Sequence, residues 1–68
     1  KLMNNLEKIY RLCDKIEKEK KYLFCLWPIV NGRLGLDVLD YETEEKVDGS
    51  TFDNALDVID WLEENYVR

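Results

Sequence analysis

The segment YLFCLWPIV, residues 22–30, is followed by Asn31-Gly32 and then by RLGLDVLDY, residues 33–41. Both runs are rich in the aromatic and branched apolar residues that favour β-strands. An Asn-Gly pair between two such runs is the strongest short signal for a β-hairpin, because a type I′ turn needs positive φ at both of its central residues. The sequence therefore predicts a hairpin whose turn consists of these two residues.

A two-residue turn also determines which side chains share a face, because it pairs Val30 with Arg33 and so sets the register. The more densely apolar face is expected to point into the core, and the other to lie open on so small a domain. An open apolar face is a candidate surface for dimerisation. Pro28 has no N–H and predicts an edge strand or a bulge. The predicted core face holds Leu23, Cys25, Trp27, Ile29, Leu34, Leu36 and Val38, and the predicted dimer face holds Tyr22, Phe24, Leu26, Leu39 and Tyr41.

Helical periodicity flanks the hairpin on both sides. Residues 1–21 carry apolar side chains at spacings of 3 and 4, with Asn4 as the expected N-cap. A second amphipathic helix is expected over residues 52–66, with Ser50 or Thr51 as its cap. Its predicted buried face consists of Phe52, Ala55, Leu56, Ile59, Leu62 and Tyr66.

The order of these elements predicts the fold class. A short third strand is expected over residues 46–48, so the chain reads helix, three strands, helix. That order predicts an α+β fold: a single α-β-β-β-α domain over residues 1–68, with a three-stranded antiparallel sheet and both helices packed on one face. Met3 resembles a natural start, so Lys1-Leu2 are expected to be an expression remnant.

The charge of the chain is divided between its two halves. The formal net charge is −5, from 15 acidic and 10 basic residues. Residues 1–35 carry +4, whereas residues 36–68 carry −9, with Lys46 and Arg68 as their only cations. Asymmetry of this kind indicates a polar interaction surface. It favours a basic protein as partner and disfavours direct binding of nucleic acid, for which a basic domain is typical.

Four acids of the second predicted helix lie on one stripe, at spacings of 4, 3 and 4. Neighbouring carboxylates on such a stripe are about 6 Å apart, which resembles the spacing of phosphates along a nucleic-acid strand. The stripe is either a solvated face or a docking surface that mimics nucleic acid, and Trp61 beside it is either an aromatic anchor or a boundary residue. The stripe comprises Asp53, Asp57, Asp60 and Glu64, and the acids of the preceding loop are Asp40, Glu42, Glu44, Glu45 and Asp48.

The sequence contains no pattern that indicates catalysis, a metal or a cofactor. The absence of histidine removes the commonest general base and metal ligand. Cys13 and Cys25 form no CxxC motif and are expected to be buried as small apolar residues. The acidic loop lacks the glycine and the final glutamate of a calcium-binding EF-hand, and no apolar run is long enough to cross a membrane. We therefore expect no enzyme, no cofactor and no membrane contact.

The function expected from these features is that of a small acidic protein-binding module of the cytoplasm, an inhibitor or adaptor that docks on a basic protein. If the basic groove normally holds nucleic acid, docking would exclude it by competition, in the manner of small phage-encoded antagonists of restriction or CRISPR systems in the host cytosol. That analogy rests on size and charge. The alternatives are a self-associating module that uses the predicted dimer face and a nucleic-acid binder that uses the first helix. The cations of that helix are Lys8, Arg11, Lys15 and Lys18, and acids interleave with them.

Overall fold

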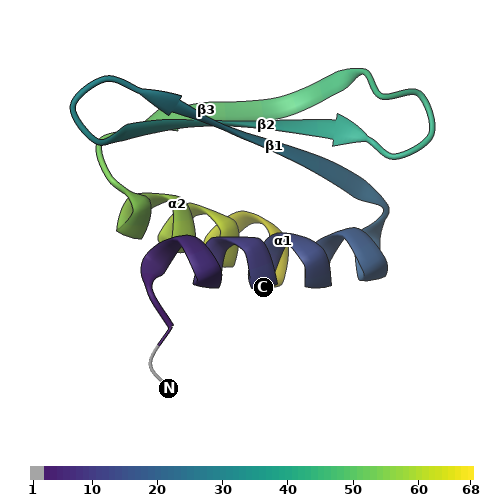
Figure 1. Cartoon of the computed structure of the whole chain (residues 1–68). Helices are drawn as coiled ribbons and strands as arrows, with labels where there is room; N and C mark the ends of the chain where they lie inside the picture. Colours follow the sequence, from purple (N-terminus) through teal and green to yellow (C-terminus); the bar gives the residue numbers. More distant parts are fainter. Residues whose placement is uncertain (1–2) are drawn as a thin grey trace.

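The residues that the computed structural model describes, 3–68, form a three-stranded antiparallel sheet with two helices packed beneath one face (Figure 1). Lys1-Leu2, the expected remnant, lie outside these residues. The predicted α-β-β-β-α fold is confirmed, with the strands in the order β1-β2-β3. The elements are α1 (Asn5–Lys20), β1 (Tyr22–Ile29), β2 (Arg33–Asp40), β3 (Lys46–Phe52), α2 (Ala55–Leu62) and a final π-helical turn, η1 (Glu63–Val67).

The first helix, α1, begins at the capping residue that the sequence predicts. The Asn4 side chain accepts a hydrogen bond from the Glu7 N–H at 2.9 Å, which satisfies one of the free donors of the first turn. The helix is closed by Lys21, whose left-handed backbone (φ 59°) turns the chain directly into β1. The buried residues of α1 are Ile9, Cys13 and Ile16.

The register of the hairpin differs by one residue from the predicted one. The turn contains three residues, 30–32, so Ile29 rather than Val30 pairs with Arg33. Because a shift of one residue moves every side chain of a strand to the opposite face, the predicted faces of β1 are wrong, whereas those of β2 are right. Tyr22, Phe24 and Leu26 pack against the core, and Leu23, Cys25, Trp27 and Ile29 lie on the open face.

The buried side of β1 is decided by Tyr66, near the other end of the chain. Its ring packs edge-on against Tyr22 and Phe24, with centroid separations of 5.2 and 5.8 Å. Its hydroxyl donates a hydrogen bond to Asp48 of β3 at 2.5 Å. Aromatic side chains bury the largest apolar areas, so enclosing these rings favours the observed register over the predicted one.

Strand β3 is longer than predicted, and α2 begins later. Phe52 ends the strand with a buried side chain, so the predicted caps, Ser50 and Thr51, lie within β3. Asn54 is the N-cap of α2, because its side chain accepts a hydrogen bond from the Asp57 N–H at 3.0 Å. The wrong cap assignment arises because Ser, Thr and Asn all suit this position, and the packing of Phe52 selects among them.

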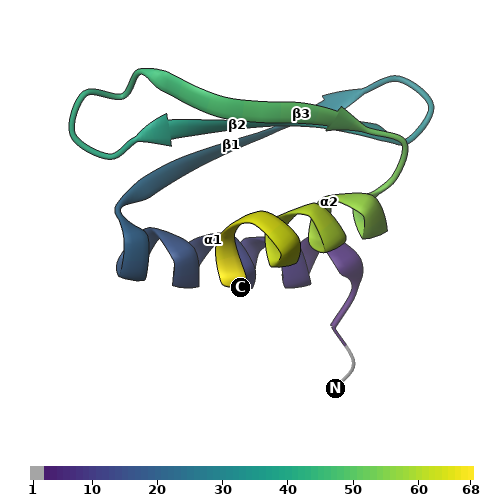
Figure 2. The ribbon, with the colours of Figure 1, turned by 180° about the vertical axis from the view of Figure 1, so that it is seen from behind.

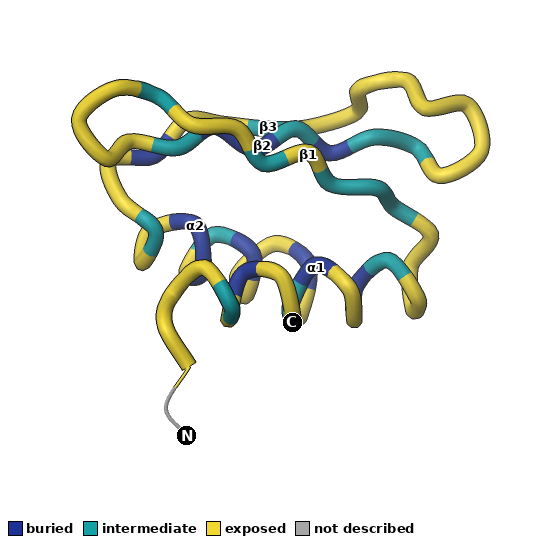
Figure 3. Tube along the Cα trace, viewed as in Figure 1, coloured by how far each residue is buried: buried dark blue, intermediate teal, exposed yellow. Residues whose placement is uncertain are grey.

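The core lies between the sheet and the two helices (Figure 3). Leu56, predicted as part of the buried face of the second helix, is 54% exposed, and Val58 is fully buried. The buried residues are Ile9, Cys13, Ile16, Leu36, Val38, Phe52, Val58, Ile59, Leu62 and Tyr66.

Both edges of the sheet carry groups that hinder pairing with another strand. Alternate N–H groups of an edge strand point away from the sheet and would otherwise be free to bind one. On β1, the Phe24 N–H donates to the Glu17 carboxylate at 3.1 Å, and Pro28 has no N–H. On β3, the Gly49 N–H donates to the side chain of Asp48 at 2.8 Å. The edge position predicted for the strand containing Pro28 is confirmed.

Substitutions at adjacent positions of β1 test the register. We expect Phe24→Ala to lower the free energy of unfolding by about 2–4 kcal/mol, because it removes a ring packed on the core. The matched control, Cys25→Ala on the open face, is expected to cost less than about 1 kcal/mol. Urea denaturation measures both, and a larger loss for Cys25→Ala would contradict the register.

Candidate protein-binding surfaces

The second helix presents an acidic face, which we define as Asp57, Asp60 and Glu64. All three residues are exposed, on the side of the helix opposite the buried Leu62. Among residues 3–68, no salt bridge involves any of them. Asp57 also lies in the first turn, where a negative charge is favourable. The acidic face is therefore a set of carboxylates without internal counter-ions.

Asp53 does not belong to the acidic face, although its spacing in the sequence places it on the predicted stripe. It precedes α2 and forms an ion pair with Arg33, with an Nε–Oδ1 distance of 3.6 Å. Both side chains are substantially exposed, so this pair contributes little to stability. The stripe thus contains three residues instead of four.

The loop acids lie at the other end of the sheet from the start of α2 (Figure 1). Glu42, Glu44 and Glu45 are exposed in the turn between β2 and β3. Asp40 shapes this turn, because its carboxylate accepts hydrogen bonds from the N–H groups of Glu42 at 2.9 Å and Thr43 at 3.0 Å. Asp48 is engaged by the hydroxyl of Tyr66. The predicted acids therefore form two separate exposed groups, and Asp40 and Asp48 have structural roles.

The pKa of Asp40 is lowered from its ordinary value of 3.8 by the hydrogen bonds from the Thr43 and Glu42 N–H groups. A lowered folded-state pKa means that the stabilisation is present above the unfolded-state pKa and is lost as the pH falls through the folded-state pKa. We expect the amide resonances of Glu42 and Thr43 to follow this titration, with a midpoint below 3.8. NMR spectra across acid pH measure it.

The control for that titration is Asp40→Asn, which keeps a side-chain acceptor and has no charge to titrate. In this variant the low-pH transition of the two amides should disappear. A transition of the wild-type amides at or above the ordinary aspartate value would contradict the turn geometry.

Trp61 is a half-buried boundary residue. Its ring lies 5.6 Å from that of Phe52 and 5.5 Å from that of Tyr66, measured between centroids. These contacts place the indole against the edge of the core, next to the acidic face. Leu56, 54% exposed, is the other large apolar side chain near that face. The sequence interpretation missed Leu56 because it assigned this residue to the buried face.

The open sheet face, which we define as Leu23, Cys25, Trp27, Ile29 and Leu39, is the surface that the corrected register produces. Trp27 remains 39% exposed, and its indole covers Gly35, where any Cβ atom would overlap the ring. Leu39 lies on this face as predicted, whereas Tyr41 is exposed in the turn beyond β2. The predicted dimer face is therefore wrong in four of its five residues.

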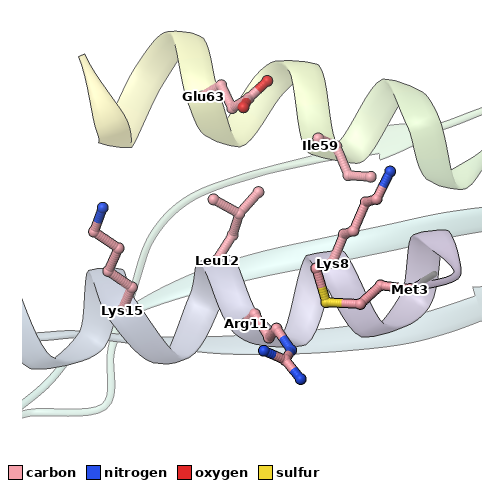
Figure 4. A pocket seen from close by; sticks show the side chains of 7 residues that line it. All are labelled: Met3, Lys8, Arg11, Leu12, Lys15, Ile59 and Glu63. Carbon is pink, nitrogen blue, oxygen red and sulfur yellow. The ribbon is translucent and has the colours of Figure 1, made fainter. Parts of the chain in front are cut away.

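A groove runs between α1 and α2 on the side away from the sheet (Figure 4). Its volume is about 320 Å³, and Leu12 and Ile59 line it with apolar side chains. Lys15 of α1 lies across the groove from Glu63 (Figure 4). The sequence places the cations on an outer helical face but cannot reveal the groove, which depends on how the two helices pack. The remaining lining residues are Met3, Lys8 and Arg11.

The two cysteines lie in opposite environments. Burial raises the pKa of the Cys13 thiol to about 12, and the nearby Glu17 carboxylate adds to the rise. Cys25 is exposed on the open sheet face, so its predicted burial is wrong. Within residues 3–68, no group of three His, Cys, Asp or Glu side chains could hold a metal ion. None of the helices in this part of the chain is long and apolar enough to cross a bilayer.

Thiol reactivity reports this difference. We expect a chromogenic disulfide reagent to modify one thiol rapidly in the folded protein, and Cys25→Ser to abolish this fast phase. Cys13 should react only in denaturant, since its thiol is buried and protonated at neutral pH. A fast phase that survives in Cys25→Ser would contradict the assigned faces of β1.

Fold and surfaces together define a small acidic α+β domain, with a charged pair of helices on one side and an apolar sheet face on the other. Over residues 4–68 the sequence matches the model of a family described as a Bacteriophage T4 protein, and the chain belongs to that family. The expected phage origin is confirmed at this level.

One relative is a protein of Enterobacteria phage T4 with the name "Uncharacterized 7.9 kDa protein in cd-pseT intergenic region". It is 94% identical to this chain over 66 residues, which are 97% of this chain and 100% of the relative. No solved structure matches the chain.

Proposed function

We propose that this phage protein is a non-enzymatic module that binds a basic protein surface in the host cytosol through the acidic face of α2. The observation that carries the proposal is that Asp57, Asp60 and Glu64 are exposed and lack an ion pair within residues 3–68. The segment from Ala55 to Val67 contains no cation. Carboxylates at spacings of three and four residues repel one another, and a basic partner would relieve that repulsion.

The carboxylates would act first on the rate of association. Charges of one sign steer an oppositely charged partner, and physiological salt screens this attraction over a Debye length of about 8 Å. The exposed turn acids Glu42, Glu44 and Glu45 add to the negative potential from the other end of the sheet. Short-range affinity would come from Leu56, which is exposed beside the acidic face, and from the free edge of the Trp61 ring.

A nucleic-acid-binding protein is the partner class that this surface fits best. Such proteins present grooves lined with lysine and arginine, spaced to contact successive phosphates. The carboxylates of α2 recur every turn at about 6 Å, so they can occupy successive phosphate sites. Occupation of the groove would exclude its nucleic acid, which makes the module an inhibitor by competition.

Charge reversal on α2 tests the proposal. The variant Asp57→Lys/Asp60→Lys/Glu64→Lys should fail to capture the basic proteins that the wild type captures from a lysate of T4-infected host cells. Capture by the wild type should also weaken as salt is raised to about 0.5 M, where the Debye length is roughly 4 Å. Quantitative mass spectrometry of the bound fractions measures both effects.

The matched control reverses three exposed acids that lie elsewhere, Glu42→Lys/Glu44→Lys/Glu45→Lys. It changes the net charge by the same amount, so it should retain most of the captured proteins if the α2 face is the docking surface. Capture of an unchanged set of proteins by the α2 variant, at the same salt, would refute the proposal.

A further inference from the structure

Three cations on the groove side of α1, which we call the basic rim, have no salt bridge within residues 3–68. Other cations of this helix are engaged: Lys18 pairs with Asp14 at 2.9 Å, and Lys20 donates to the Tyr66 carbonyl at 2.6 Å. The rim residues are spaced by three and four, so they repel one another in the isolated chain. The basic rim consists of Lys8, Arg11 and Lys15.

The basic rim lies next to acids of α2 on the same outer surface. Both helices begin beneath the end of the sheet that carries the β1–β2 turn, and they run side by side in the same direction (Figures 1 and 2). Leu12 and Ile59 meet in the groove between them (Figure 4). Since Leu62 is buried, helical geometry places Asp60 and Glu64 on the outer side of α2. The helix layer thus has a basic half and an acidic half.

We propose that a second copy of this chain packs on the helix layer, about a two-fold axis that runs along the groove. Rotation about this axis exchanges the halves, so α1 of each copy lies over α2 of the other, and the interface is self-complementary. The rim of one copy then faces Asp60 and Glu64 of its partner. A two-fold axis across the helices would set α1 on α1, with like charges opposed, and is therefore disfavoured.

The inference rests on the proposed docking role of the α2 acids and names one basic surface that they bind. Charge balance supports a second copy as the occupant. The chain carries a net charge of −5, yet the three rim cations are matched by Asp60, Glu63 and Glu64 on the same layer. Apolar contact at the centre comes from Leu12 and Ile59 in the groove and from exposed Leu56.

A charge-swap pair tests the arrangement. One variant carries Lys8→Glu/Arg11→Glu/Lys15→Glu, and the other carries Asp60→Lys/Glu63→Lys/Glu64→Lys. We expect the wild type to form a dimer at low salt, and each variant alone to have its dimer dissociation constant raised at least about tenfold. An equimolar mixture should recover a dimer, because both contacts then pair opposite charges. Sedimentation equilibrium of labelled variants measures each species.

Carbodiimide cross-linking provides a second measurement that needs no variant. It joins a lysine to a carboxylate in direct contact, and a mixture of ¹⁴N- and ¹⁵N-labelled wild type identifies links between copies. We expect such links from Lys8 or Lys15 to Asp60 or Glu64. A wild type that remains monomeric at low salt and yields no such links overturns the inference, as does a mixture that recovers no dimer.

The control Trp27→Asp alters the open sheet face and should leave the dimer intact. If it abolishes the dimer while the charge-swap variants do not, the second copy binds the open sheet face and the inference is overturned. A monomeric wild type leaves the proposed capture of basic proteins unaffected, since capture needs only one copy. Failure of the proposed function is seen separately, in the lysate experiment with the α2 variant.

Discussion

The packing of Tyr66 beneath the sheet is the interaction on which the rest of the structure depends. One side chain near the end of the chain contacts Tyr22 and Phe24 of β1, and its hydroxyl bonds to Asp48 of β3. Lys20 of α1 donates to its carbonyl, so both helices and both edge strands meet there. Burial and the hydrogen bond to Asp48 raise the pKa of the phenol, which keeps it a hydrogen-bond donor at neutral pH.

The dependence on Tyr66 explains which parts of the fold the sequence predicts. Periodicity and capping are local properties, so α1, its cap at Asn4 and the order of elements follow from the sequence alone. The register of the hairpin is not local. Both faces of β1 are apolar, and a turn of two or three residues is compatible with Asn31-Gly32. The choice between them is made by a contact with a residue more than forty positions away.

The candidate site divides in the same way. Helical spacing identified Asp57, Asp60 and Glu64, because a shared face requires only the helix. It could not separate them from Asp53 and Asp48, whose partners lie on other elements. The charge asymmetry of the sequence also acquires a spatial meaning. The positive and negative halves of the chain contribute α1 and α2, which lie beside each other in one layer.

The guarded edges of the sheet determine what kinds of assembly this small domain can enter. Glu17, Pro28 and Asp48 occupy or remove the backbone donors through which strands add to one another. Growth by strand addition is open-ended, since every added strand presents a new edge. With that route obstructed, association proceeds through faces, and a face shared by two-fold symmetry is consumed when two copies meet. The geometry therefore limits assembly to closed particles of fixed size and disfavours fibres, even at the high concentrations of an infected cell.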